Sequence, residues 1–511
     1  MHQLPAELLE EVFSNCCDLS RPTNFRGASG NHVQDSRAAT LNGMNELSAL
    51  AVSHVCTRWR EILLFSPKLW SRVEIHGRLE DLTDTQVLST LSLTKLYLER
   101  SKQLPLDIVI EFLDTFPMDH EPICISDSQY EKARALLPMY KLFFAEAHRW
   151  RNVSISVYCE LFGRRFWDDS PWPDKFPILQ HLTIHVYGDG DDGSVGFQTS
   201  LRILEAPLLQ TLIHVGHDVT IFTEDDAGPL QSLCTASFTG CLHEPTLLLA
   251  GPLTDLTLDN INGFTYPGGH TTTSCLAKAV HIIVMERHEN WIVSGIFDYL
   301  SLSNLTKFSL DAVVLTGSLV AFPCDEFMSL LNRSSRLSVT QLSLISVFMP
   351  DRELHSILSL LPSLTHLAVG EATFHSRLQD DEDDEDYLAW LEEVYEQEET
   401  PMLSKAFFHS LSHSNSSHPT AFSALLLSNL MELHIGFGNF NRDVQSGFVD
   451  MVRSRWDEAR FGALKYIRAK AHAIRKDDGI LGLDEEVNIE WVTSSTEWRA
   501  GLGDWKIAAT N

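Results

Sequence analysis

The sequence has no run of about 18 consecutive apolar residues, the length that a membrane-spanning helix needs. Its first residues, MHQLPAELLEEVF, contain no basic segment followed by an apolar core, so we expect no secretory signal. Basic residues are scarce: 39 Lys and Arg stand against 69 Asp and Glu, a formal net charge of −30. Because binding to phosphate groups needs Lys and Arg, nucleic acid and anionic membranes are poor candidate partners. These absences predict a cytoplasmic or nuclear protein.

Motifs for catalysis and metal binding are also missing. There is no Gly-x-Ser-x-Gly, no phosphate-binding glycine loop and no His-Glu-x-x-His. The nine cysteines have no repeated spacing, which predicts free, buried thiols, and Cys234, Cys241 and His243 have no second pair for a zinc site. An acidic stretch at 187–197 has Ser200 where a calcium loop needs glutamate. The histidines of 409–420 have no cysteine or carboxylate ligand among them.

We therefore predict a protein that is not an enzyme and that has no cofactor and no metal. An esterase-like enzyme whose strands imitate repeats is the enzymatic alternative.

One pattern returns from residue 70 onward: apolar, two variable residues, apolar, one variable residue, apolar. Clear copies are Leu93-Leu96-Leu98, Leu179-Leu182-Ile184, Leu253-Leu256-Leu258 and Leu430-Leu433-Ile435, and looser copies begin at Trp70, Trp150, Leu305, Val339 and Leu364. With weaker copies included, the starts lie 21–34 residues apart, except for 66 between Leu364 and Leu430. This period is typical of leucine-rich repeats, in which the last three positions form a strand and a helix or loop returns.

The pattern predicts an α/β chain with an irregular leucine-rich-repeat solenoid over 76–478 and a C-terminal tail or cap over 479–511. An ordinary leucine-rich α/β domain is the alternative. Stacked repeats present their variable strand positions on a long surface that usually binds another protein. The residues expected on this substrate face are Lys95, Tyr97, Asn152, His181, Asp255, Lys307, Gln341, His366 and His434, with Arg72 and Glu74 on the first strand.

Residues 379–400, QDDEDDEDYLAWLEEVYEQEET, carry twelve carboxylates and no basic residue. So many charges do not enter a core, because the loss of their hydration is too costly. We expect an acidic loop that projects from the repeats. Leu388, Leu391 and Val394 have helical spacing within it, so a docking helix is the alternative.

The N-terminal residues carry more apolar surface than a short helical hairpin can bury. LPAELLEEVF begins with a helix start signal, since Pro5 fits the first turn and Glu7 suits the positive end of a helix. Residues 18–46 are polar and rich in Gly, Ser and Asn, which predicts an inserted loop. Helical spacing resumes from Leu47 to Leu63, and SPKLW predicts a further short turn of helix.

This order of features resembles the F-box, especially that of fungal F-box proteins. The resemblance covers residues 4–75, within a predicted F-box domain of residues 1–75. It is carried by Leu4-Pro5, Leu8-Leu9, Val12-Phe13, VCTRWR at 55–60 and PKLW at 67–70. It implies a three-helix unit that binds the Skp adaptor, and through it cullin, in SCF-type ubiquitin ligases. The repeats would then capture a protein substrate.

The resemblance places nine residues at the adaptor contact: Leu4, Pro5, Leu8, Leu9, Val12, Phe13, Val55, Cys56 and Trp59. Trp70 is expected to join the helices to the first repeat, since it also begins the first copy of the pattern. A leucine-rich-repeat interaction scaffold with a drifted F-box, outside any ligase, is the alternative function.

Overall fold

A computed structural model describes most of the helical and strand segments of the chain. The described residues are 4–18, 48–79, 81–112, 127–158, 175–187, 199–202, 206–216, 219–222, 232–243, 253–265, 273–285, 291–313, 322–334, 338–371, 402–412, 426–437, 442–456, 464–470 and 489–492. The acidic segment 379–400, most of the predicted insertion at 18–46, most of the tail from 479, and the stretch after Tyr187 lie outside them.

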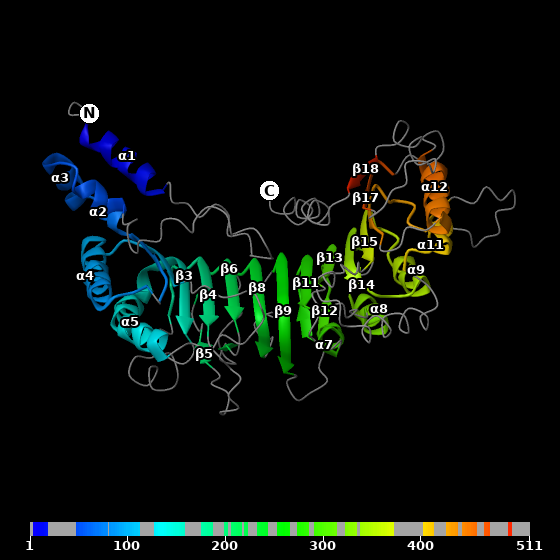
Figure 1. The fold of residues 1–511 in the computed structure, drawn as a ribbon, viewed down its shortest axis with the longest axis horizontal. Helices are drawn as coiled ribbons and strands as arrows, with labels where there is room; N and C mark the ends of the chain where they lie inside the picture. The colour runs from blue at the N-terminus through cyan, green and yellow to red at the C-terminus, as the bar shows by residue number, and fades with distance from the viewer. Residues whose placement is uncertain are drawn as a thin grey trace, which may run out of the picture. The chain divides into compact units, whose positions relative to one another are not determined.

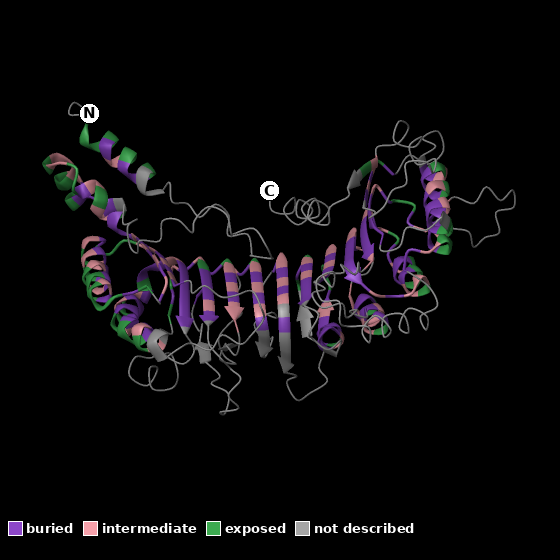
Figure 2. Cartoon of the chain, in the orientation of Figure 1, coloured by how far each residue is buried: buried purple, intermediate pink, exposed green. Residues whose placement is uncertain are grey.

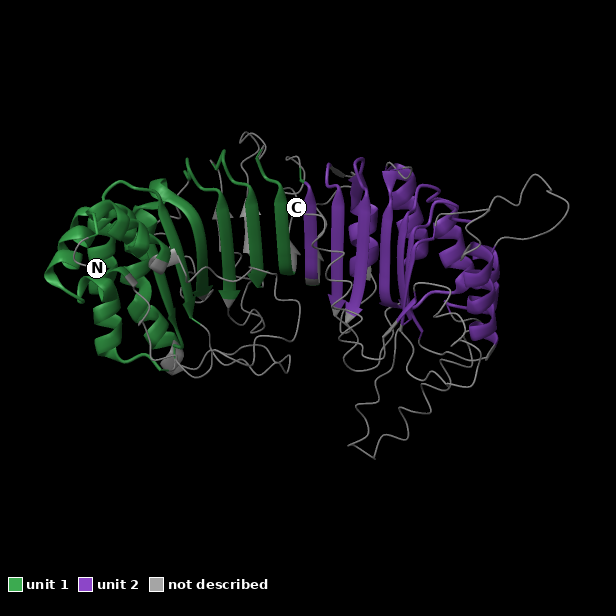
Figure 3. Cartoon of the chain, turned by 90° about the horizontal axis from the view of Figure 1, so that it is seen from above, with its two compact units in different colours: residues 1–253, 261–268 green, residues 254–260, 269–511 purple. Residues whose placement is uncertain are grey.

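The chain divides into two compact units, which Figure 3 colours separately. Unit 1 contains residues 1–253 and 261–268, and unit 2 contains residues 254–260 and 269–511. Each unit is described by itself below.

Unit 1 begins with helices, alternates strands and helices as far as β3, and continues with strands (Figure 1). Its helical elements are α1 (Ala6–Asp18), α2 (Ser48–Ser53), α3 (Thr57–Phe65), the 3-10 turn η1 (Pro67–Trp70), α4 (Asp84–Arg100), α5 (Asp127–Ala145) and the 3-10 turn η2 (Ala147–Arg149). Its strands are β1 (Arg72–Gly77), β2 (Leu106–Phe112), β3 (Trp150–Tyr158), β4 (His181–Tyr187), β5 (Thr199–Arg202), β6 (Thr211–Gly216), β7 (Val219–Phe222) and β8 (Thr235–His243).

Unit 2 alternates strands and helices over most of its length. Its strands are β9 (Asp255–Thr265, whose last residues belong to unit 1), β10 (Thr273–Cys275), β11 (Ala279–Met285), β12 (Leu300–Leu302), β13 (Lys307–Val313), β14 (Gln341–Val347), β15 (His366–Glu371), β16 (Glu432–Gly436), β17 (Tyr466–Lys470) and β18 (Ile489–Val492). Its helices are α7 (Trp291–Tyr299), α8 (Cys324–Arg333), α9 (Asp351–Ser359), α11 (Lys405–Leu411) and α12 (Arg442–Trp456).

The main sheet has fourteen described strands, and they follow one another in chain order: β1-β2-β3-β4-β6-β8-β9-β11-β13-β14-β15-β16-β17-β18. The pairings are parallel, for example β1 with β2 and β13 with β14. Strands β5 and β7, and strands β10 and β12, form two further parallel pairs. The α/β class predicted from the sequence is confirmed. The order also excludes a doubly wound sheet, in which the strand order reverses at a switch point.

Apolar side chains of neighbouring strands are held in one register. Ile75 of β1 pairs with Ile110 of β2, which pairs with Ile155 of β3, and all three are buried. In unit 2, Leu310 pairs with Leu344, which pairs with Val369. Because strand side chains alternate between the two faces of a sheet, the residues between these apolar positions point away from the buried row. Strand β1 shows this alternation of buried and half-buried residues along its whole length.

One clear copy of the repeat pattern was assigned to the wrong element. Leu93, Leu96 and Leu98 lie in helix α4, not in a strand, and the strand of this repeat is β2. The Thr83 hydroxyl accepts from the Gln86 amide, and the Gln86 side chain accepts from the Thr83 amide, so a capping box begins α4. Its buried residues have helical rather than strand spacing: Val87, Thr90, Thr94 and Tyr97. Lys95 is therefore an exposed helix residue, and Tyr97 is buried.

Tyr97 joins α4 to the N-terminal helices. Its ring contacts that of Trp70, with centroids 5.0 Å apart, and its hydroxyl accepts from the Leu50 amide of α2 at 3.3 Å. The buried indole of Trp70 donates to the Leu63 carbonyl of α3 at 2.7 Å. Trp70 thus connects α3 to α4, which is the joining role expected for it.

Three arginines, Arg149, Arg333 and Arg455, bridge successive helical segments through backbone carbonyls, and we call them the bridging arginines. Arg149 of η2 donates to the Leu104 carbonyl, just beyond α4, at 3.0 Å. Arg333 of α8 donates to the Leu300 carbonyl, just beyond α7, at 3.2 Å. Arg455 of α12 donates to the carbonyls of Leu411, at the end of α11, and of Leu427, at 2.6 and 2.8 Å.

Arg455, which is buried, provides a test of this role. Its burial lowers its pKa to about 10, so the guanidinium is still charged at neutral pH. Arg455→Met removes the side-chain donor to the Leu411 carbonyl and one of the two donors to the Leu427 carbonyl, which also accepts from the Leu430 amide. Because buried acceptors lose hydrogen bonds, we expect the free energy of unfolding to fall by about 3 kcal/mol. Urea denaturation measures this. Arg453→Met, at an exposed position of the same helix, is the control and should change stability by less than about 0.5 kcal/mol. Equal stability of the two variants would contradict the role.

Candidate functional site

Helix α1 has buried and exposed residues (Figure 2), and large apolar residues occur among both. Leu9 and Phe13, four residues apart, are each 1% exposed and form its buried side. Leu8 and Val12 have the same spacing but are 53% and 46% exposed. Leu4, which precedes the helix, continues their row at 38% exposure. We call Leu4, Leu8 and Val12 the α1 stripe.

The buried side of α1 fixes the helix against α3. The rings of Phe13 and Trp59 are 4.8 Å apart between centroids, and Leu63 of α3 is fully buried. Arg58 of α3 donates to the Leu4 carbonyl at 2.5 Å, which also holds the chain just before α1. The α1 stripe is therefore presented by a helix whose adjacent side is packed against α3.

Exposed apolar side chains gather in the N-terminal helices. Ten large apolar residues are exposed among those described, and six of them lie between residues 4 and 65: Leu4, Leu8, Val12, Val55, Leu64 and Phe65. Single exposed apolar residues are common on protein surfaces, but a row along one helix indicates an interaction site. The concentration makes α1–α3 the first candidate site.

The nine residues predicted at the adaptor contact fall into three groups. Those that are exposed are Leu4, Pro5, Leu8, Val12 and Val55, and Cys56 and Trp59 are half-buried. Leu9 and Phe13 lie in the core, so they position α1 and do not present their side chains to a partner. Leu64 and Phe65 were not among the predicted adaptor contacts, although Phe65 is 84% exposed. Their signal is an apolar pair at the end of α3, beyond the last core residue Leu63.

The second candidate site consists, in each unit separately, of variable residues at or near the start of several strands. Asn152 of β3 pairs with His181 of β4 in unit 1. In unit 2, Lys307, Gln341 and His366 occupy one register on β13, β14 and β15. Asp255 has the same register on β9, and Ala279 of β11 stands between it and Lys307. We call these six residues, Asn152, His181, Asp255, Lys307, Gln341 and His366, the strand-start row.

The unit 1 part of the row is organised around Asp107 of β2. Its carboxylate accepts from the Arg151 guanidinium at 3.0 Å and from the Asn152 amide at 2.7 Å. The hydrogen bond to Asp107 raises the pKa of Arg151. Burial lowers the pKa of His181, and the charge of Asp107 only partly opposes this. The arrangement is an ion pair next to a neutral imidazole, which can donate and accept hydrogen bonds.

His434 does not belong to the predicted substrate face. It is 3% exposed, and its ring lies 5.6 Å from that of Tyr466. The residue in register with His366 is Glu432, whose Oε1 is 3.6 Å from the His366 Nε2. His434 occupies the next outward position of β16. It pairs with Ala368 of β15, which is buried, on one side and with Arg468 of β17 on the other. The prediction was wrong because it took the last variable position of this copy instead of the one before the second apolar residue.

The buried His434 predicts a loss of stability in mild acid. Burial, with the charges of Arg468 and His366, lowers its pKa to about 4 from the ordinary 6.5. The unfolded chain therefore binds a proton between these values that the folded chain does not, so stability falls as pH falls from 6.5 to 4. We expect the wild-type protein to lose about 2 kcal/mol more than His434→Asn between pH 7 and pH 5 in urea denaturation.

Exposed His355 of α9 provides the control for this experiment. His355→Asn should keep the wild-type dependence on pH. An equal dependence in wild type and His434→Asn would contradict the buried neutral imidazole.

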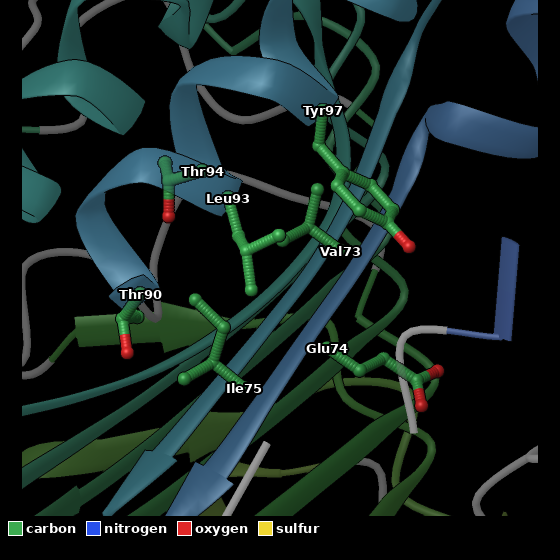
Figure 4. A pocket seen from close by; sticks show the side chains of 7 residues that line it. All are labelled: Val73, Glu74, Ile75, Thr90, Leu93, Thr94 and Tyr97. Atoms are coloured by element: carbon green, nitrogen blue, oxygen red, sulfur yellow. The ribbon is translucent and has the colours of Figure 1, made fainter. Parts of the chain in front are cut away.

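A small cavity lies between β1 and α4, lined by Val73, Glu74, Ile75, Thr90, Leu93, Thr94 and Tyr97 (Figure 4). Its volume is about 10 Å³, enough for one water molecule and too little for a substrate. The Thr94 hydroxyl is buried at this cavity and has no hydrogen-bond partner among the described residues. The cavity is a packing feature of the first repeat, not a ligand site.

Thr94→Val replaces that hydroxyl by a methyl group of similar size. Because a buried polar group without a partner is destabilising, we expect the free energy of unfolding to rise by about 1 kcal/mol. Thr94→Ser keeps the hydroxyl and loses the methyl, so it should destabilise the protein. Thermal unfolding of the three proteins measures both effects, and a less stable Thr94→Val would show that the hydroxyl is hydrogen-bonded in solution.

The described part of the chain offers no candidate centre for cysteine or metal chemistry. No three His, Cys, Asp or Glu residues described there are grouped closely enough to hold a metal ion. The described cysteines Cys56, Cys234 and Cys324 form no disulfide. Of these three, only Cys324 is buried, and burial raises its pKa, so it is a poor nucleophile. Cys234 is exposed, which corrects the expectation of a buried thiol there.

Comparisons with known proteins do not supply a family: no protein-family model matches the sequence, and no curated protein matches it significantly. Within the described ranges, no helix combines the length and the apolar composition that crossing a membrane requires.

Proposed function

We propose that the protein is the substrate-recognition subunit of an SCF-type cullin-RING ubiquitin ligase. The observation that carries the proposal is the α1 stripe: an exposed apolar row on a helix whose other side is held by Leu9, Phe13 and Trp59. The stripe falls on Leu-Pro and on the first members of the Leu-Leu and Val-Phe pairs through which the sequence resembles an F-box. In this proposal α1–α3 form the F-box, and Leu4, Leu8, Val12 and Val55 contact the Skp adaptor.

The proposal assigns the strands and returning helices to an irregular leucine-rich-repeat solenoid. Three features support this assignment: the parallel strands follow chain order, each pairs with its neighbours in register, and helices return between strands such as β13, β14 and β15. The Leu-x-x-Leu-x-Leu positions before and within these strands are buried, as Leu305, Phe308 and Leu310 illustrate. A stack of this kind has no enclosed catalytic pocket as its centre, which favours binding over catalysis.

Within each unit, the residues of the strand-start row are proposed contacts for a target protein. These residues are half-buried or exposed and differ in charge from strand to strand, from Asp255 to Lys307 to the neutral Gln341. Such a mixture suits recognition of a folded or extended protein segment by hydrogen bonds and isolated ion pairs. The target would be carried to the ligase through the adaptor bound at α1.

Binding of the purified Skp adaptor to the full chain tests the proposal. We expect Leu8→Asp/Val12→Asp to weaken binding by at least about 100-fold, because two apolar contacts are replaced by charges that the interface must desolvate. Both residues are exposed, so circular dichroism should show unchanged helix content. Isothermal titration calorimetry measures the dissociation constants.

Leu88→Asp is the matched control, since Leu88 is 63% exposed on α4, outside α1–α3. It should bind like the wild-type chain. If the folded wild-type chain does not bind the adaptor, the ligase role fails, and an interaction scaffold with a drifted F-box becomes the better description.

A further inference from the structure

Helix α1 is acidic as well as apolar. It contains four carboxylates, Glu7, Glu10, Glu11 and Asp18, and no basic residue. With about 3.6 residues per turn, Glu7 and Glu11 follow one another along one edge of the α1 stripe. Both are exposed. The opposite edge of the stripe leads to Leu9 and Phe13, which are buried, so only one edge is open and that edge is negative.

The basic residues of the neighbouring helices are engaged elsewhere. Arg58 of α3 donates to the Leu4 carbonyl, and Arg60 donates to the Ser53 carbonyl at 3.2 Å. Within the described part of the chain, neither Glu7 nor Glu11 takes part in an ion pair. A partner that covers the stripe therefore meets two carboxylates whose charge is not balanced by an ion pair from the described helices.

We propose that the adaptor surface that receives the α1 stripe is bordered by Lys or Arg side chains that pair with Glu7 and Glu11. This inference rests on the adaptor role proposed above. A neutral or acidic border would desolvate or repel the two carboxylates, which is unfavourable. A basic border steers the two surfaces together, so its main effect is on the rate of association. The apolar stripe supplies the lasting contact, and the glutamates supply speed and orientation.

Association kinetics of the full chain with the purified Skp adaptor test the inference. Stopped-flow rates are compared at about 50 mM and about 500 mM salt, since the higher concentration screens surface charges. We expect Glu7→Gln/Glu11→Gln to lower the association rate constant about three- to tenfold at low salt and to differ little from wild type at high salt. Glu11→Lys, which lies beyond the first turn of α1, should associate more slowly still.

The matched control removes the same number of charges from other surfaces. Glu99 of α4 and Asp298 of α7 are exposed, and Glu99→Gln/Asp298→Asn should associate at nearly the wild-type rate. Circular dichroism checks that Glu7→Gln, which changes the first turn, leaves α1 folded.

The outcomes separate this inference from the function on which it rests. If the adaptor binds tightly but the association rate depends neither on salt nor on the Glu7/Glu11 substitutions, the inference of a basic border is wrong. The adaptor role is then unaffected. No adaptor binding by the folded wild-type chain overturns both. Slower association in the glutamine and lysine variants only, with loss of affinity in Leu8→Asp/Val12→Asp, supports both.

Discussion

The rest of the structure depends on the burial of apolar side chains in register between parallel strands. Ile75, Ile110 and Ile155 show the arrangement: all three are buried, and Ile110 of β2 pairs with Ile75 on one side and with Ile155 on the other. A parallel pair cannot be joined by a tight turn, so the chain must return by a longer connection between strands. In several repeats this return is a helix, and the bridging arginines fix successive helical segments to one another. The outward-facing positions of the strands do not take part in this packing and remain available for other roles, such as binding.

The same constraint explains which parts of the fold were readable from the sequence. Leu179-Leu182-Ile184 and Leu430-Leu433-Ile435 predicted β4 and β16 because the apolar positions of a strand entering a repeat core have little freedom. The strand predicted at Leu93-Leu96-Leu98 was wrong because the same spacing also fits a helix. The capping box of Thr83 and Gln86 favours the helix here. The triplet alone does not distinguish these outcomes. The spacing of the residues around it, from Val87 to Tyr97, does.

The candidate site at the N-terminus was predictable in composition but not in orientation. Leu8 with Val12 and Leu9 with Phe13 are two apolar pairs of identical spacing, shifted by one residue. Sequence alone does not say which pair faces the core, because that depends on where Trp59 and Leu63 lie in space. Asn152, His181, Lys307, Gln341 and His366 lie at the strand positions expected for them, and their role as substrate contacts stays a prediction. On β16 the prediction named His434, which is buried, instead of Glu432, which lies two residues earlier and is half-buried.

The strand order carries a consequence for how the chain is made. Each strand of the main sheet bonds to strands near it in the sequence, so most of its contacts close short loops. A newly synthesised segment can therefore find its packing partner in the segment that left the ribosome just before it. Folding can proceed from the N-terminal helices forward, repeat by repeat, without waiting for the last strand. A growing chain of this design always ends in an unfinished edge, and the time for which that edge stays uncovered is set by translation speed.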